Sequence, residues 1–199
     1  MRNKIILAMA AAGMMCATSA FAAADGDSGG GTINFTGSVI NAPCSVSTDS
    51  QNINVLLGQV SNSRLSGVDT YSDPKKITIS LIDCSFAAAP GKPDPGTTGN
   101  YSKVAVTFTG FSPANSQALT KGEIPNAAPN GAKNVVIQLL KSDITTPVNL
   151  SETPTIDNAI PLITSSKNND LIFYARMAAT DTVTTGDVSA QITYKLKYF

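Results

Sequence analysis

Apolar and polar residues alternate in short runs over most of the chain, a pattern typical of β-strands with one buried face. The clearest runs, rich in β-branched and aromatic residues, span residues 77–82, 104–109, 134–140 and 171–177. Clusters of turn-forming residues separate them at residues 90–96, 125–131 and 165–170. The pattern predicts an all-β fold, an antiparallel β-sandwich of immunoglobulin-like type. The antibody signature cannot apply, because the chain has no tryptophan.

A regular alternation near the N-terminus stands apart from this sandwich pattern. Residues 23–30 form a small, polar, Gly-rich lead that offers little to pack. The next segment, residues 31–39, has polar residues on one face and a second face made of Gly31, Ile33, Phe35, Gly37 and Val39. A strand this regular requires one buried face.

The C-terminal segment, residues 187–199, keeps the same period throughout and predicts a long strand. Its apolar face carries Val188, Ala190, Ile192, Tyr194, Leu196 and Tyr198. Gly186 precedes it and could be an ordinary turn glycine. A long edge strand with an apolar face is a liability that proteins normally cover, so we expect something to cover this one.

The first residues read as an export signal. Arg2 and Lys4 precede an apolar run at residues 5–15, and small residues follow where a signal peptidase cuts. We expect cleavage after Ala22, with Ala24 as the alternative site. The run is too short to span a bilayer, so we expect no direct membrane insertion. A lipoprotein anchored at Cys16 is disfavoured, because two methionines stand where small residues would be needed.

Charge and composition exclude several functions. Lysine and arginine balance aspartate and glutamate, and no basic stripe suggests nucleic acid. The chain has no histidine, which removes Ser-His and Cys-His catalysis and most zinc sites. Nucleotide-binding and esterase motifs are also missing from the sequence. We expect neither an enzyme nor a bound metal or cofactor.

Two cysteines remain once the signal has been removed, Cys44 and Cys84. In an exported chain such a pair predicts a disulfide. The rival interpretations, a zinc pair or a redox couple, need further ligands or a closer spacing. Closing a loop of about 40 residues would stabilise the fold by about 4 kcal/mol through the entropy of the unfolded chain.

Three pieces of sequence carry a family resemblance. The first runs Gly-Thr-Ile-Asn-Phe-Thr-Gly-Ser-Val-Ile-Asn-Ala-Pro-Cys, from Gly31 to Cys44, and the second is Ile-Ser-Leu-Ile-Asp-Cys, ending at Cys84. The third is Gly186 with the alternating segment that follows it and the penultimate Tyr198. On these residues the chain, from Gly31 to Phe199, resembles the chaperone–usher pilins of the type 1 and P fimbrial kind.

The resemblance implies an incomplete immunoglobulin-like sandwich, which lacks its last strand and is completed by donor-strand complementation. A groove would stay open beside the C-terminal strand. The residues implied for this acceptor groove and for chaperone recognition are Gly186, Val188, Ala190, Ile192, Tyr194, Leu196, Tyr198 and Phe199. A periplasmic chaperone would fill the groove first, with its basic residues gripping the carboxylate of Phe199. At an outer-membrane usher, the N-terminal extension of the next subunit would replace the chaperone.

The same resemblance implies a domain plan and a function. Residues 1–22 would be the signal peptide, residues 23–39 the donor-strand extension and residues 40–199 the pilin domain. The chain would be a structural subunit of a surface fimbria that supports adhesion, exported through the periplasm. Its partners would be other pilin subunits, joined head to tail.

Alternative interpretations remain open at this point. Ile33, Phe35 and Val39 could belong to the first strand of the protein's own sandwich, in a secreted monomer that never polymerises. The chain could also be a fimbrial adhesin or minor tip subunit that binds a host carbohydrate or protein receptor. A tip adhesin is disfavoured, because such proteins resemble two domains in tandem and this chain has room for one.

Overall fold

The computed structural model describes residues 31–86 and 101–199. The signal peptide and the polar lead expected in residues 1–30 lie outside this range, and so does the turn cluster at residues 90–96. By its contacts the chain divides into one unit that ends at Val39 and a second unit from Ile40 to Phe199. The second unit contains every strand and helix described below.

The larger sheet of this second unit has five antiparallel strands in the order β1-β2-β7-β5-β4. Their bounds are β1 Ser45–Val46, β2 Lys75–Ile82, β7 Asn169–Ala179, β5 Val135–Leu140 and β4 Glu123–Pro125. β7 is the central strand, because it pairs with β2 on one side and with β5 on the other. Two short helices accompany the strands, α1 Thr48–Gln51 and α2 Ser116–Thr120.

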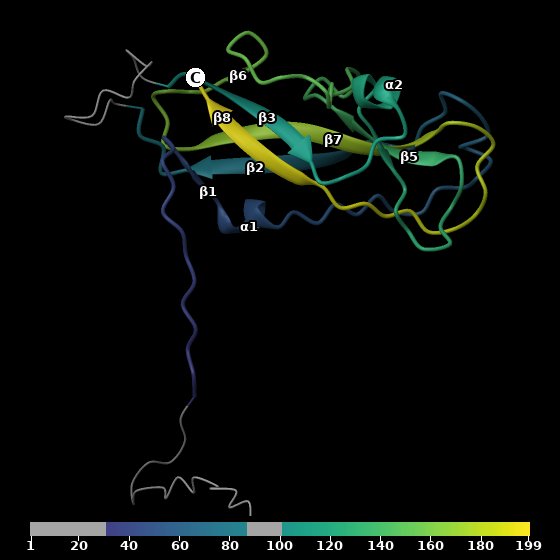
Figure 1. The fold of residues 1–199 in the computed structure, drawn as a ribbon, viewed down its shortest axis with the longest axis horizontal. Helices are drawn as coiled ribbons and strands as arrows, with labels where there is room; N and C mark the ends of the chain where they lie inside the picture. Colours follow the sequence, from purple (N-terminus) through teal and green to yellow (C-terminus); the bar gives the residue numbers. More distant parts are fainter. Residues whose placement is uncertain (1–30, 87–100) are drawn as a thin grey trace, which may run out of the picture. The chain divides into compact units, whose positions relative to one another are not determined.

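The smaller sheet has three antiparallel strands in the order β6-β3-β8. Their bounds are β6 Ile160–Pro161, β3 Lys103–Thr109 and β8 Thr193–Tyr198. In Figure 1, β3 and β8 cross in front of β2 and β7, so the two sheets form separate layers. β8 stands at the edge of its sheet, because among the described strands it pairs with β3 alone.

The core lies between the two sheets. Ile79 and Leu81 of β2 and Leu171 of β7 are almost fully buried on the five-stranded side, and Val104 of β3 is buried opposite them. The rings of Phe108 and Phe173 meet edge to face, with their centroids 5.3 Å apart, and join β3 to β7. This packing gives the immunoglobulin-like sandwich that the sequence predicts.

The disulfide predicted between Cys44 and Cys84 is present, and both cysteines are buried. It joins the residue just before β1 to the loop just after β2. A backbone hydrogen bond from the amide of Ser85 to the carbonyl of Pro43, 2.7 Å long, lies beside it. The bridge therefore fixes the point at which the chain enters the sandwich.

The four strand runs read from the alternation are confirmed as β2, β3, β5 and β7. The expected strand over residues 187–199 is wrong in its first half, because regular pairing begins only at Thr193. Residues 187–189 instead make backbone hydrogen bonds to the loop after β4, from Ala132 to Asp187 and from Ala127 to Ser189. The alternation predicted which side chains share a face, but it could not predict which segment the backbone of residues 187–192 bonds to.

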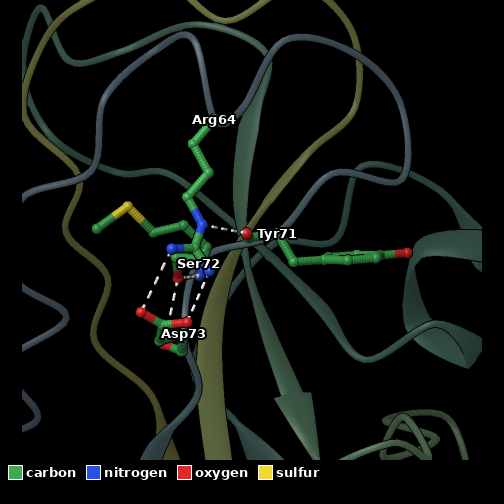
Figure 2. Close-up of polar contacts among 5 residues, drawn as sticks. Arg64, Tyr71, Ser72 and Asp73 are labelled. Carbon is green, nitrogen blue, oxygen red and sulfur yellow. Dashed lines mark hydrogen bonds and ion pairs between the residues drawn. The ribbon is translucent and has the colours of Figure 1, made fainter.

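Ser72 extends the pairing of β2 with β7 past Pro74, which has no backbone N–H to give to the ladder. The amide of Ser72 donates to the carbonyl of Met177, and the hydroxyl oxygen of Ser72 accepts from the amide of Met177, both at 2.9 Å. Figure 2 shows Arg64 beside this turn, directed at the carbonyl of Tyr71 and the carboxylate of Asp73. The pair of Arg64 and Asp73 is exposed and contributes little. The buried hydroxyl of Ser72 therefore helps to hold this turn, beside the backbone hydrogen bonds from Ser72 to Met177 and from Ala179 to Thr70.

Ser72→Ala is expected to lower the free energy of unfolding by about 1–3 kcal/mol, because it leaves the buried amide of Met177 without an acceptor. Equilibrium urea unfolding of the oxidised chain measures the change. The control is Ser63→Ala, an exposed serine whose removal should change the value by less than about 0.5 kcal/mol. Equal effects of the two substitutions would contradict this account of the turn.

Candidate functional site

The free edge of β8 is the first wall of the candidate site. β8 pairs with β3 along its whole length, with Thr193 opposite Thr109 at one end and Tyr198 opposite Val104 at the other. Within the described part of the chain, no strand pairs with the other edge of β8. Its apolar side chains Tyr194, Leu196 and Tyr198 pack against the core but are only half-buried. Both the backbone edge and part of the apolar face of β8 therefore remain available.

An extended segment, residues 53–60, forms the second wall. Ile53, Val55 and Leu57 are half-buried and pack against the core, whereas Asn54 and Leu56 between them are exposed. This alternation is that of a strand, yet among the described residues the backbone of this segment makes no hydrogen bond to a neighbour. The second wall therefore also offers unpaired main-chain donors and acceptors.

Between these walls lies an open groove of about 2160 Å³. Its floor is apolar and comes from both sheets, with Ile79, Ile137 and Leu139 on the five-stranded side and Phe108 on the other. A sandwich whose core is lined but not covered along one side is missing a strand there. The groove has the shape and the chemistry to accept an extended apolar segment.

Tyr194 links the two sides of the groove. Its hydroxyl donates to the carbonyl of Ser50 in α1, 2.7 Å away, and the hydroxyl oxygen of Ser50 accepts from the amide of Ser80 in β2 at 2.9 Å. α1 leads directly into residues 53–60, so this chain of bonds ties β8 to the start of the opposite wall. These hydrogen bonds therefore fix the distance between β8 and the start of residues 53–60.

Tyr198 lies near the end of β8 in an apolar setting. Its ring meets that of Tyr101 edge to face, with the centroids 6.0 Å apart. Its hydroxyl is buried and, among the described residues, has no hydrogen-bond partner. Burial, with a smaller effect of Tyr194, raises the pKa of the Tyr198 phenol to about 12. Burial also raises the pKa of Tyr194.

The residues expected in the acceptor groove do not all behave alike. Val188, Ile192, Tyr194, Leu196 and Tyr198 line the groove and are half-buried. Ala190 and Gly186 also line it but are exposed. Phe199 is not part of the lining, and its backbone continues the pairing with Lys103.

Residues 31–39 belong to the first unit and have no regular secondary structure. Every one of them is exposed, including Ile33 at 75%, Phe35 at 89% and Val39 at 103%. A Cβ added to Gly31 or Gly37 would meet no atom within 4 Å. Among the described residues, no side chain therefore covers the apolar face of this alternating segment.

Two parts of the site could not be predicted from the sequence pattern. The alternation of Ile53, Val55 and Leu57 was a usable signal for the second wall, but it is short and lies in a polar stretch. The second part is Asn126, whose side chain bonds the backbone of Ala132 and Asp187. It gave no signal, because a single asparagine in a turn cluster is ordinary. Among residues 31–86 and 101–199, no three His, Cys, Asp or Glu side chains form a group that could hold a metal ion. Over the same ranges, no helix has the length and apolarity needed to cross a membrane.

The sequence of this chain is similar to those of known fimbrial proteins. The family described as fimbrial protein matches residues 33–199. Long polar fimbria protein A of Salmonella typhimurium is 32% identical over 98% of this chain and 97% of its own length. The F17 fimbrial protein of Escherichia coli is 30% identical, covering 84% of this chain and 87% of its own length.

Solved structures agree with the sequence relatives. The P pilus rod subunit PapA superposes with a TM-score of 0.60 at 25% identity, covering 79% of this chain and all of its own. A subunit of a chaperone–usher pilus, whose structure was determined to explain rod uncoiling, gives a TM-score of 0.64 at 25% identity and covers 87% of this chain and 98% of its own. The chain therefore belongs to the fimbrial protein family.

Proposed function

We propose that this chain is a structural subunit of a surface fimbria and polymerises head to tail, with residues 23–39 of one copy filling the groove beside β8 of the next. Membership of the fimbrial protein family supports the structural role, as do the names of the relatives, which are those of fimbrial proteins. The role is mechanical, and we assign no catalytic residue to it.

One observation carries the proposal: the same chain has an open apolar groove and an exposed apolar segment of matching form. The groove lacks a strand between β8 and residues 53–60, and residues 31–39 are extended with Ile33, Phe35 and Val39 exposed. As a strand, the nine residues 31–39 would span about 30 Å. Adding an extended segment to an open sheet edge is an established mode of binding, and chaperone–pilin complexes are among its known examples.

The energetics favour a tight contact. Burying Ile33, Phe35 and Val39 would contribute roughly 1.5–3 kcal/mol each. The main-chain groups of the entering strand would meet those of β8 and of residues 53–60, which among the described residues lack strand partners. The glycines Gly31 and Gly37 allow close approach where the groove is shallow.

Donor and acceptor are different surfaces of one chain, so the contact is heterologous. Contacts of this kind repeat without closing unless their rotation happens to bring the last copy back to the first. An open filament is the expected product.

The same groove requires a temporary occupant before polymerisation, because an uncovered edge of this kind invites aggregation. We assign that role to a periplasmic chaperone, whose basic residues would hold the carboxylate of Phe199, and the exchange of strands to an outer-membrane usher. The resemblance to chaperone–usher pilins and the similarity to a chaperone–usher pilus subunit support this assignment.

Phe35→Asp is expected to abolish fibres, because a carboxylate would have to enter the apolar groove without a partner. Negative-stain electron microscopy of cells that express the variant as their only copy of this subunit measures the effect. The variant's own groove should still bind a synthetic peptide of residues 23–39 with the wild-type sequence.

The matched control for this experiment is Asn34→Asp, which adds the same charge one position away, on the polar face. It should leave the fibres intact. Normal fibres from Phe35→Asp would overturn the proposal. If the Phe35→Asp chain also failed to bind the peptide, Phe35 would belong to the core of its own domain.

Alkaline pH should weaken the folded subunit through Tyr198. The pKa of its phenol is about 12 in the folded chain and about 10 when unfolded, so between these values the unfolded chain loses a proton that the folded chain keeps. Stability from this group is therefore complete below pH 10 and is lost as the pH rises towards 12. Tyr198→Phe should make urea unfolding less dependent on pH over this range. An unchanged dependence would show that the phenol of Tyr198 titrates normally.

A further inference from the structure

We propose that Asn126 is a positioning residue. It fixes the shape of the acceptor groove at the end where the C-terminal segment, residues 187–199, begins. This inference rests on the proposed function, because it assigns the residue a part in accepting the donor strand. Asn126 lies just after β4 and is half-buried. It does not line the groove itself, so it acts through the segments that do.

The carboxamide of Asn126 uses its full hydrogen-bonding capacity on two stretches of backbone. Its Nδ2 donates to the carbonyl of Ala132 and to that of Asp187, both at 2.9 Å. Its Oδ1 accepts from the amide of Ala128 at 3.1 Å and from that of Ser189 at 2.9 Å. Two donations and two acceptances at one short side chain require an amide, since a carboxylate cannot donate and a hydroxyl has a single hydrogen.

Two of these four partners lie in the loop at residues 126–132 and two lie at the start of the C-terminal segment. Backbone hydrogen bonds run alongside, from Ala127 to Ser189 at 2.8 Å and from Ala132 to Asp187 at 2.9 Å. The side chain therefore joins two segments that are far apart in sequence and have no regular strand pairing with each other.

Two glycines let the segments approach this closely. A Cβ on Gly131 would lie 2.5 Å from the carbonyl oxygen of Asp187, and a Cβ on Gly186 would lie 2.5 Å from the amide nitrogen of Ala132. Gly186 also has a φ of 155°. The role that the sequence left open for Gly186, a plain turn glycine, is thus replaced by a close backbone contact with the loop.

This contact decides the form of the groove at that end. Ala128 and Ala132 of the loop and Val188 of the C-terminal segment all line it. Regular pairing of the C-terminal segment begins only at Thr193, so residues 187–189 depend on the loop for their place. Without the Asn126 side chain, the backbone on both sides of Val188 would keep only the two backbone hydrogen bonds to the loop.

The test compares Asn126→Ala with Asn115→Ala in the full chain, refolded with its disulfide oxidised. Every chain in the test also carries Phe35→Asp, so that its own donor segment does not fill the groove of another copy. Asn115 caps α2 by accepting from the amide of Ala118 at 2.8 Å, so both substitutions remove a side chain that holds backbone, and Asn115 lies away from the groove. The probe is a labelled synthetic peptide of residues 23–39, and its affinity is measured by fluorescence anisotropy. Asn126→Ala should weaken binding about 10-fold or more, whereas Asn115→Ala should leave it within about two-fold.

Hydrogen exchange in the same samples separates positioning from general destabilisation. In Asn126→Ala the amides of Ala127, Ala132 and Ser189 should lose protection while those of β2 and β7 keep it. Equal peptide affinity for Asn126→Ala and its Phe35→Asp parent would overturn the inference and leave the proposed function standing. Loss of protection throughout the sandwich would also overturn it, because Asn126 would then support the whole domain. A parent Phe35→Asp chain that fails to bind the peptide would instead overturn the proposed function.

Discussion

The unpaired edge of β8 is the constraint on which the rest of this structure depends. A sandwich normally closes its core between its two sheets, whereas in the described part of this chain the edge of β8 is open over an apolar floor. Three features hold the domain together beside this open edge. The disulfide fixes one end of β2, the edge-to-face rings of Phe108 and Phe173 join the layers, and Tyr194 holds the groove walls at a set distance.

The alternation of residues was enough to predict the fold and the strands that build its centre. Runs such as residues 77–82 and 171–177 appear as β2 and β7, because a strand with one buried face must alternate whatever its partner is. The short strands β1, β4 and β6 could not be found this way. Two or three residues carry no period, and their place depends on neighbours distant in sequence.

The candidate site was only partly visible in the sequence for a related reason. Val188, Ile192, Tyr194, Leu196 and Tyr198 could be placed on one apolar face, and they do line the groove. Their periodicity could not show that residues 187–189 rest on a loop, nor that residues 53–60 form the opposite wall. Both arrangements depend on tertiary contacts, and Asn126 acts through backbone groups that every residue shares.

The position of the disulfide has a mechanical consequence in the proposed fibre. Tension between neighbouring subunits would run along the donor segment and enter its own domain a few residues after Val39. Cys44 is the first point there at which the chain is covalently cross-linked, and its partner Cys84 follows directly on β2. A force on the donor segment would therefore act on β1 and β2 together. From β2 it would pass to the central strand β7, with which β2 pairs. Unpeeling of the two-residue β1 would then be limited by a covalent bond rather than by its few hydrogen bonds.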